Sequence, residues 1–203
     1  MDARTLDQVD VVETPVKTAA PQSQITTAEN PAPHKTASRM QVRLVEPRDR
    51  AALQNLLIQH HVVTEFRDQP FSPWKFNQNF DHVVSRTPRN VGMVAELVQE
   101  NTGQTATRPR SRIIGAAWAG ADSNMLSGGP LFVTVQLIAV DLESGPVGRA
   151  KAFLALVAGI RQWAASMNAS HSFIHVTTGS NLAATDRLMK AAGARMVGGA
   201  YVV

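Results

Sequence analysis

The chain has 203 residues, of which 44% are hydrophobic and 18% charged, so it can bury the core of one ordinary domain and carry a tail. Its 20 Lys and Arg against 16 Asp and Glu give a net charge of +4, which permits an anionic ligand but does not predict nucleic-acid binding. The lack of cysteine excludes a disulfide framework, a thiolate nucleophile and a cysteine-based zinc site.

Residues 1–39 are rich in Thr, Pro, Ala and Gln and contain few large apolar side chains. They cannot bury enough surface to offset their ordering entropy, so we expect a flexible, disordered N-terminal tail before a domain at residues 40–203. The alternative is an arm that becomes ordered on a protein partner. No apolar segment of a signal peptide and no run of roughly 18 apolar residues is present, so a cytoplasmic protein without a membrane span is expected.

The start of the domain predicts a strand followed by a helix. Polar and apolar residues alternate over Gln41–Val45, which is typical of a half-buried strand. Asp49 is placed to cap the helix that follows. One face of this helix carries residues at helical spacing, namely Leu53, Leu56, Leu57 and then His60 or His61. The two histidines also suit a helix C-terminus, where the helix dipole favours a cation.

Residues 64–90 form an aromatic and polar connection. Pro70 and Pro73 are expected to break any long helix there, leaving a short helix over residues 80–85. The aromatic side chains either shape a substrate pocket or pack the connection onto the core.

Two strands are predicted next, over Val91–Gln99 and Arg112–Ala119, and they form an antiparallel hairpin with a long polar connection. Arg108, Arg110 and Arg112 make a small basic cluster at the end of this hairpin. The cluster is either a solvated tip or a contact for an anion.

The most informative part of the chain is residues 131–194. It predicts a buried strand over Leu131–Val140, a glycine-bearing turn over Asp141–Gly148 and an amphipathic helix from Arg149 onward. A second strand from His171 onward and a second helix from residue 179 onward follow. The strand–helix–strand unit predicts parallel strands. With a last strand near the C-terminus, the element order predicts the α/β class, with a mixed central sheet and helices on both faces.

The strand and turn carry a resemblance to a known family. Val135–Val140, followed by Arg149-Ala-Lys-Ala152-Phe-Leu154, resembles the central strand and phosphate turn of the GNAT superfamily of acyl-CoA-dependent N-acetyltransferases. The resemblance covers roughly residues 41–203. It implies that the strand backbone, at Ile138 and Val140, pairs with the pantetheine amides of acetyl-CoA. It also implies that the turn, with Arg149, Lys151, Ala152 and Leu154, holds the pyrophosphate.

The downstream helix extends the resemblance. Asn181-Leu-Ala-Ala184 and the later Lys190-Ala-Ala-Gly193 are similar to the segment that follows the fifth strand in that family. The resemblance implies that Asn181 contacts the cofactor. Its alternative role is to cap the helix without any ligand.

The chain departs from the family pattern at three places. Ala152 and Leu154 stand where the turn has glycines, which allow phosphate to approach the backbone closely. An alternative register, Gly145–Gly148, recovers glycines but puts Glu143 in the place of the arginine. Met189 stands where many members have a tyrosine that acts as general acid, and methionine cannot donate a proton.

Acetyl transfer needs a base for the ammonium group and an acid for the departing thiolate. Glu96 is the candidate base by position, His175 is a candidate base or acid, and Tyr201 is a candidate acid. Their alternatives are a solvated carboxylate, a structural histidine and a strand residue without a catalytic role. The six histidines have no metal-ligand spacing, so no metal site is expected.

Two functions are therefore predicted. The first is a divergent N-acyltransferase that moves an acetyl group from acetyl-CoA to an unknown amine. The second is a GNAT-fold protein that has lost catalysis and acts as a structural or interaction module tethered by its tail. The degenerate turn also resembles phage-encoded members of the family, which would place the protein in the host cytoplasm or the virion.

Overall fold

The computed structural model describes residues 38–99, 110–175 and 182–198. Contacts divide the chain into two units, Met1–Lys35 and Thr36–Val203, and all described residues belong to the second. The predicted tail lies outside the described residues, apart from Ser38 and Arg39, which belong to the first strand.

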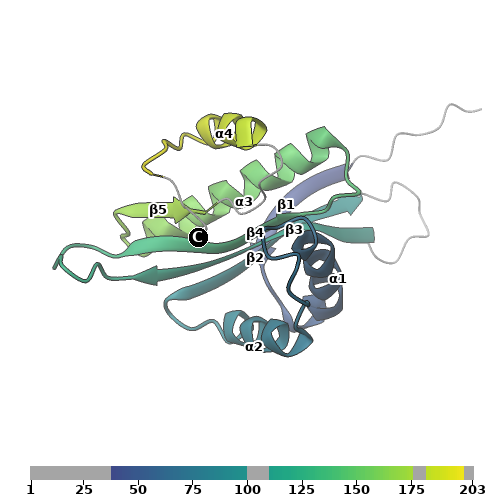
Figure 1. Cartoon of the computed structure of the whole chain (residues 1–203), viewed down its shortest axis with the longest axis horizontal. Coiled ribbons are helices and arrows are strands. Elements are labelled where there is room, and N and C mark those ends of the chain that lie inside the picture. The colour runs from purple at the N-terminus through teal and green to yellow at the C-terminus, as the bar shows by residue number, and fades with distance from the viewer. Residues whose placement is uncertain (1–37, 100–109, 176–181, 199–203) are drawn as a thin grey trace, which may run out of the picture. The chain divides into compact units, whose positions relative to one another are not determined.

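Strands and helices follow the predicted order through the described residues (Figure 1). In chain order they are β1 (Ser38–Leu44), a short 3-10 turn (Pro47–Asp49), α1 (Arg50–His61), α2 (Pro73–Val84), β2 (Asn90–Gln99), β3 (Arg110–Asp122), β4 (Phe132–Val140), α3 (Pro146–Ser166), β5 (His171–Ile174) and α4 (Leu182–Ala191).

The strands form one mixed sheet in the order β1-β2-β3-β4-β5. The first three neighbouring pairs are antiparallel, and β4 and β5 are parallel. The parallel pair is joined by α3, as expected for a helical crossover between parallel strands. The predicted α/β class with a mixed central sheet is confirmed.

Each face of the sheet carries its own hydrophobic core. One core lies under α3, where Leu156 and Ile160 meet Val135 of β4. The other lies under α1 and α2, where Leu53 and Phe80 are among its fully buried side chains. Figure 1 shows α3 and α4 on one side of the sheet and α1 and α2 on the other. The predicted coverage of both faces is confirmed.

Helix α1 follows the predicted stripe. Its buried residues are Leu53, Leu56, Leu57 and His60, at the spacing of one helical face. Asp49 stands before the helix as predicted, but its side chain caps the preceding turn, because its Oδ2 accepts a hydrogen bond from the amide of Glu46 at 2.8 Å.

Helix α2 is longer than predicted, because Pro73 begins it instead of breaking it. Proline is tolerated in the first helical turn, where its missing N–H would have no partner in the helix. Ser72 caps the helix by accepting a hydrogen bond from the amide of Lys75 at 3.3 Å. Phe76 and Phe80 then turn toward the sheet and are buried. Phe76 and Phe80 are therefore core residues, whereas Trp74 in the same helix is 65% exposed.

Helix α3 also begins at a proline, Pro146, three residues before the predicted start at Arg149. Strand β5 ends at Ile174, and the part of the predicted strand after His175 lies outside the described residues. The predicted last strand falls on residues 199–203, outside the described residues, and residues 195–198 have no regular secondary structure.

Candidate functional site

Over its second half, β4 has a strand neighbour on one side only among the residues that the structure describes, and we call the other side the open edge. Strand β5 pairs with β4 only over Phe132–Val135 among the described residues. At the same point the pairing with β3 shifts, because Trp118 pairs with Leu137 while Ala119 pairs with Val135, which leaves Gln136 as an extra residue. From Leu137 to Val140, β4 therefore pairs with β3 on one side, and no strand of the described residues pairs with it on the other. Such an edge can bind an extended ligand that carries amides.

The open edge leads into a tight turn held by Asp141. The Asp141 carboxylate accepts hydrogen bonds from the Glu143 amide and the Ser144 hydroxyl, both at 3.0 Å. It also pairs with Arg112 of β3 at 2.8 Å. These contacts fix the backbone that delivers the chain from β4 to α3.

Helix α3 starts without a side-chain cap. Gly145 is the N-cap residue, no side chain accepts from the first turn, and Pro146 has no N–H to donate. The amides of Val147 and Gly148 have no acceptor within the helix, because the first turn of any helix leaves its amides unpaired. Together with the positive end of the helix dipole, they suit an anion.

The predicted phosphate turn at residues 149–154 lies inside α3. Ala152 is fully buried against the sheet, so it cannot touch a ligand here. Arg149 and Leu154 are partly buried, and Lys151 is exposed. Of the two registers, Gly145–Gly148 lies at the start of the helix and residues 149–154 lie within it, and which of them holds phosphate stays a prediction. The helix takes in residues 149–154 because Pro146 fixes its start ahead of Arg149.

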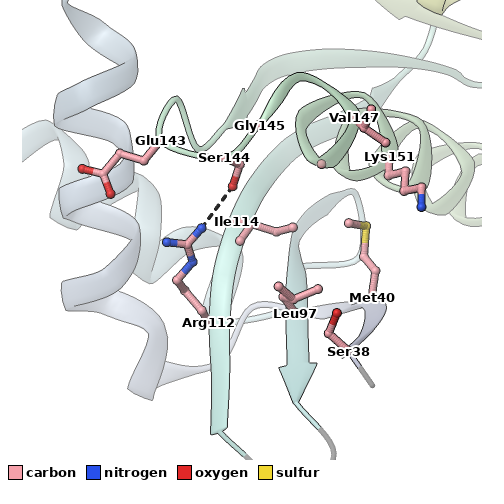
Figure 2. A pocket seen from close by; sticks show the side chains of 11 residues that line it. Ser38, Met40, Leu97, Arg112, Ile114, Glu143, Ser144, Gly145, Val147 and Lys151 are labelled. Atoms are coloured by element: carbon pink, nitrogen blue, oxygen red, sulfur yellow. Dashed lines mark hydrogen bonds between the residues drawn. The ribbon is translucent and has the colours of Figure 1, made fainter. Parts of the chain in front are cut away.

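A cavity of about 500 Å³ lies beside the start of α3 (Figure 2). Its apolar lining comes from Met40, Leu97, Ile114 and Val147. Its polar lining comes from Ser38, Arg112, Glu143, Ser144 and Lys151, together with the backbone of Gly145 and Gly148. Figure 2 shows the Arg112 guanidinium reaching Ser144, to which it donates at 3.1 Å. Lys151 lies on the α3 wall and adds a cation beside the uncapped helix start.

The structure places Glu96, the candidate base, in an ion-pair network. It lies on β2, two strands away from β4, and its Oε2 accepts hydrogen bonds from Arg43 at 2.9 Å and Gln41 at 3.0 Å. The hydrogen bond from Arg43 lowers the pKa of Glu96 to about 2. Such a weak base accepts a proton poorly at neutral pH. Its contacts are those of a structural residue.

The other candidates are only partly described. His175 is exposed and follows the end of β5, so it is not in the middle of a strand as predicted. Asn181 and Tyr201 lie outside the described residues. Met189 lies on α4 and is partly buried. The roles of His175, Asn181 and Tyr201 stay predictions.

Sequence reasoning missed the distinction between the adjacent histidines His60 and His61. His60 is buried, whereas His61 is only partly so, and its Nε2 lies 2.7 Å from the carbonyl oxygen of Gln69. Burial, followed by the charge on His61, lowers the pKa of His60. The available signal was the helical spacing, which places His60 four residues after Leu56.

No group of three or more His, Asp or Glu side chains able to hold a metal ion occurs in residues 38–99, 110–175 or 182–198. Within the same ranges, none of the helices has the length and apolar character needed to cross a membrane.

Comparison with known proteins identifies the fold. No protein-family model and no curated protein matches the chain. Among solved structures, the aminoglycoside N-acetyltransferase AAC(6')-Iy in complex with CoA is similar with a TM-score of 0.58 and 14% identity, over 83% of this chain and 96% of that chain. Glucosamine-6-phosphate N-acetyltransferase from Arabidopsis thaliana is similar with a TM-score of 0.54 and 14% identity, over 81% and 97% of the two chains.

A third similar structure is a transcriptional regulator from Bacillus halodurans C-125, with a TM-score of 0.60 and 12% identity, over 81% of this chain and 99% of that chain. All three comparisons cover nearly the whole of the solved chain. The described residues therefore have the GNAT fold, and the fold predicted from the sequence is confirmed.

Proposed function

We propose that this protein is an acyl-CoA-dependent N-acetyltransferase, which moves an acetyl group from acetyl-CoA to an amine. The observation that carries the proposal is the continuity of two features. No described strand pairs with the second side of β4 from Leu137 to Val140, and this stretch leads to the uncapped start of α3. A structurally similar acetyltransferase has been solved in complex with CoA.

The residues present fit acetyl-CoA in three respects. The backbone of β4 at Ile138 and Val140 can pair with the pantetheine amides in the manner of an added strand. The amides of Val147 and Gly148 can donate to the pyrophosphate. Lys151, with Arg149 nearby on α3, adds positive charge where the phosphates would lie. Ala152 and Leu154 are assigned no direct contact with phosphate.

The amine nitrogen attacks the carbonyl carbon of the thioester, and the thiolate leaves. A backbone amide of the open β4 edge is suited to hold the oxyanion that develops. His175 and Tyr201 remain the candidates for the acid that protonates the thiolate.

The test is thiol release from acetyl-CoA by the full chain in the presence of primary amines, including an aminosugar, a polyamine and an aromatic amine. We expect release above the rate without protein for at least one amine, and a Gly148→Asp variant should lose it because a carboxylate would oppose the pyrophosphate. No release with any amine, together with no binding of acetyl-CoA, would contradict the proposal.

The second candidate function is a GNAT-fold module without catalysis, such as a phage virion-associated protein tethered by residues 1–39. Met189 on α4 favours it, because the resemblance places a proton-donating tyrosine there. Binding of acetyl-CoA separates the two candidates.

A further inference from the structure

The inference concerns the acceptor of the acetyl group and rests on the proposed function. With its phosphates at the start of α3 and its pantetheine amides at Ile138 and Val140, acetyl-CoA runs backward along β4. Its acetyl group then lies near Leu137 and Gln136, where the open edge begins. The acceptor amine must reach this point, so the side chains around Gln136 bear on which class of amine is accepted.

Two amide side chains converge over Gly120, on the sheet face opposite to α3. Ala119 and Ala121 face the core under α3, and successive residues of a strand point to opposite faces, so a side chain at position 120 would point to the other face. A Cβ atom there would lie 3.2 Å from Oδ1 of Asn90 and 3.4 Å from Nε2 of Gln136. Glycine therefore leaves β3 without a side chain at a place where two polar groups meet.

These two amides are suited to hydroxyl groups. Nδ2 of Asn90 donates to the hydroxyl of Thr87 at 3.1 Å, which directs Oδ1 toward Gly120 as an acceptor. Gln136 is exposed and presents Nε2, a donor. A hydroxyl group both donates and accepts hydrogen bonds, so it can bond to either amide.

Three rings lie on the same face at the neighbouring strands. Val133 and Ile174 pack in the core under α3, so the adjacent Phe132 and Phe173 point to the opposite face. Phe173 meets Phe132 edge-on, with ring centroids 5.8 Å apart, and stacks with His171 at 6.0 Å. Phe173 is 36% exposed, and this end of the sheet extends past α1 and α2 in Figure 1. The rings therefore present an apolar surface that a ligand can cover.

The amides and the rings lie in one row across the sheet. Asn90 of β2 pairs with Gly120 of β3, and Gly120 pairs with Thr134 of β4. Thr134 in turn pairs with Phe173 of β5. Neighbouring strands are about 4.8 Å apart, so roughly 10 Å separates Gly120 from Phe173. One six-membered ring with its substituents can span this distance.

A carboxylate on the same face favours a cationic acceptor. Asp122 follows Ala121, which faces the core under α3, and it pairs with Phe132. Asp122 is exposed, and its Oδ1 accepts a hydrogen bond from the amide of Ser123 at 2.7 Å. Its negative charge attracts an ammonium group toward this face.

We propose that the acceptor is an aminosugar, bound on the sheet face opposite to α3. Its hydroxyl groups bond to Asn90 and Gln136, one face of its ring packs on Phe173, and its amine faces the acetyl group near Leu137. A polyamine or an aromatic amine without hydroxyl groups leaves both amides without a partner in the complex, which disfavours it.

The test measures the product complex, because N-acetylated products are neutral and their binding reports the hydroxyl and ring contacts alone. The full chain is saturated with CoA. Binding of N-acetylglucosamine is then measured by saturation-transfer NMR beside N-acetylcyclohexylamine, which has the same ring size and amide but no hydroxyl groups.

Two truncations and two matched controls are measured in the same way. Gln136→Ala and Phe173→Ala remove the proposed contacts. Gln59→Ala and Phe66→Ala remove the same side chains from exposed positions, on α1 and in the α1–α2 connection. Calorimetric titration with CoA is run on every variant, and it reports separately on the cofactor site.

We expect N-acetylglucosamine to bind about tenfold more tightly than N-acetylcyclohexylamine, because two hydrogen bonds are gained. Gln136→Ala and Phe173→Ala should each weaken its binding about fivefold, with the two controls unchanged. Gly120→Ala should weaken it as well, because its methyl group would occupy the place where the amides converge.

The two ways of failing are distinguishable. If CoA binds but the product without hydroxyl groups binds equally well, the aminosugar assignment is overturned. The same holds if Gln136→Ala and Phe173→Ala bind N-acetylglucosamine as the controls do. If calorimetry detects no CoA binding to the parent chain, the proposed function itself fails and the assignment falls with it.

Discussion

Arg43 donates from its Nε to Oε2 of Glu96 at 2.9 Å, and this contact joins β1 to β2 across 53 residues of sequence. The same guanidinium donates to both carboxylate oxygens of Asp49, at 2.7 and 2.9 Å. The side chains of Asp49 and Glu96 are 4% and 8% exposed, so their charges are compensated within the protein. Arg43 therefore fastens the start of α1 to the sheet, and Glu96 is part of that anchor.

This anchor predicts a pH dependence of stability. The pKa of Glu96 falls from 4.5 to about 2 on folding, so its stabilisation is complete above pH 4.5 and is lost as the pH falls toward 2. The shift corresponds to about 3 kcal/mol. Urea unfolding between pH 4.5 and pH 2 should show this loss of stability in the parent chain and not in Glu96→Gln. The control is Glu143→Gln, because Glu143 is exposed in the turn before α3. Equal pH dependence of stability in the parent chain and in Glu96→Gln would contradict the anchor.

The core under α3 predicts a large effect of truncating Leu156. Its side chain is fully buried. Leu156→Ala should lower the free energy of unfolding by about 2–5 kcal/mol, through lost burial and the cavity that remains. Leu126→Ala is the matched control, because Leu126 is 93% exposed in the β3–β4 connection and should change stability by less than about 0.5 kcal/mol. Similar urea midpoints for the two variants would refute the packing described.

Gly148→Ala should change stability and cofactor affinity in opposite directions. A Cβ atom at Gly148 would meet Cβ of Ser144 at 3.7 Å, an ordinary contact, so the helix accepts it and gains up to about 1 kcal/mol in helix propensity. The same methyl group would stand where the phosphate approaches the backbone, so affinity for acetyl-CoA should fall. Thermal unfolding and calorimetry measure the two effects. Unchanged affinity would remove Gly148 from the site, and Gly128→Ala controls for an unrelated glycine.

Charge reversal at Lys151 should weaken acetyl-CoA binding. Lys151→Glu puts a carboxylate beside the proposed pyrophosphate position, and we expect affinity to fall at least about tenfold, or about 1.4 kcal/mol. Arg48→Glu makes the same change in net charge at a side chain that is 69% exposed in the turn before α1. If both variants bind equally well, the effect is one of net charge alone and the site lies elsewhere.

The sequence predicted the element types because their periodicity is local. The leucine stripe of α1 and the buried run of β4 could both be read from residue spacing. Helix starts were less accurate, because Pro73 and Pro146 suit the first helical turn as well as a break. Reading Pro146 as part of the turn placed the predicted start of α3 at Arg149, three residues too late.

Features that depend on distant pairing could not be predicted. The extra residue at Gln136 appears only when β3 and β4 are aligned, and it follows Val135, the last residue of β4 that pairs with β5 in the described part of the chain. Glu96 resembled a candidate base because nothing near it in sequence reveals Arg43. His60 and His61 are adjacent and identical in type, so only the folded helix assigns one to the core and the other to Gln69.

The most direct test of the central claim is calorimetric titration of the full chain with acetyl-CoA. The open edge of β4 and the uncapped start of α3 predict one site per chain with micromolar affinity, about −8 kcal/mol, weakened by Lys151→Glu and not by Arg48→Glu. Absence of binding at millimolar acetyl-CoA would contradict the enzyme assignment and leave the GNAT fold as an interaction module.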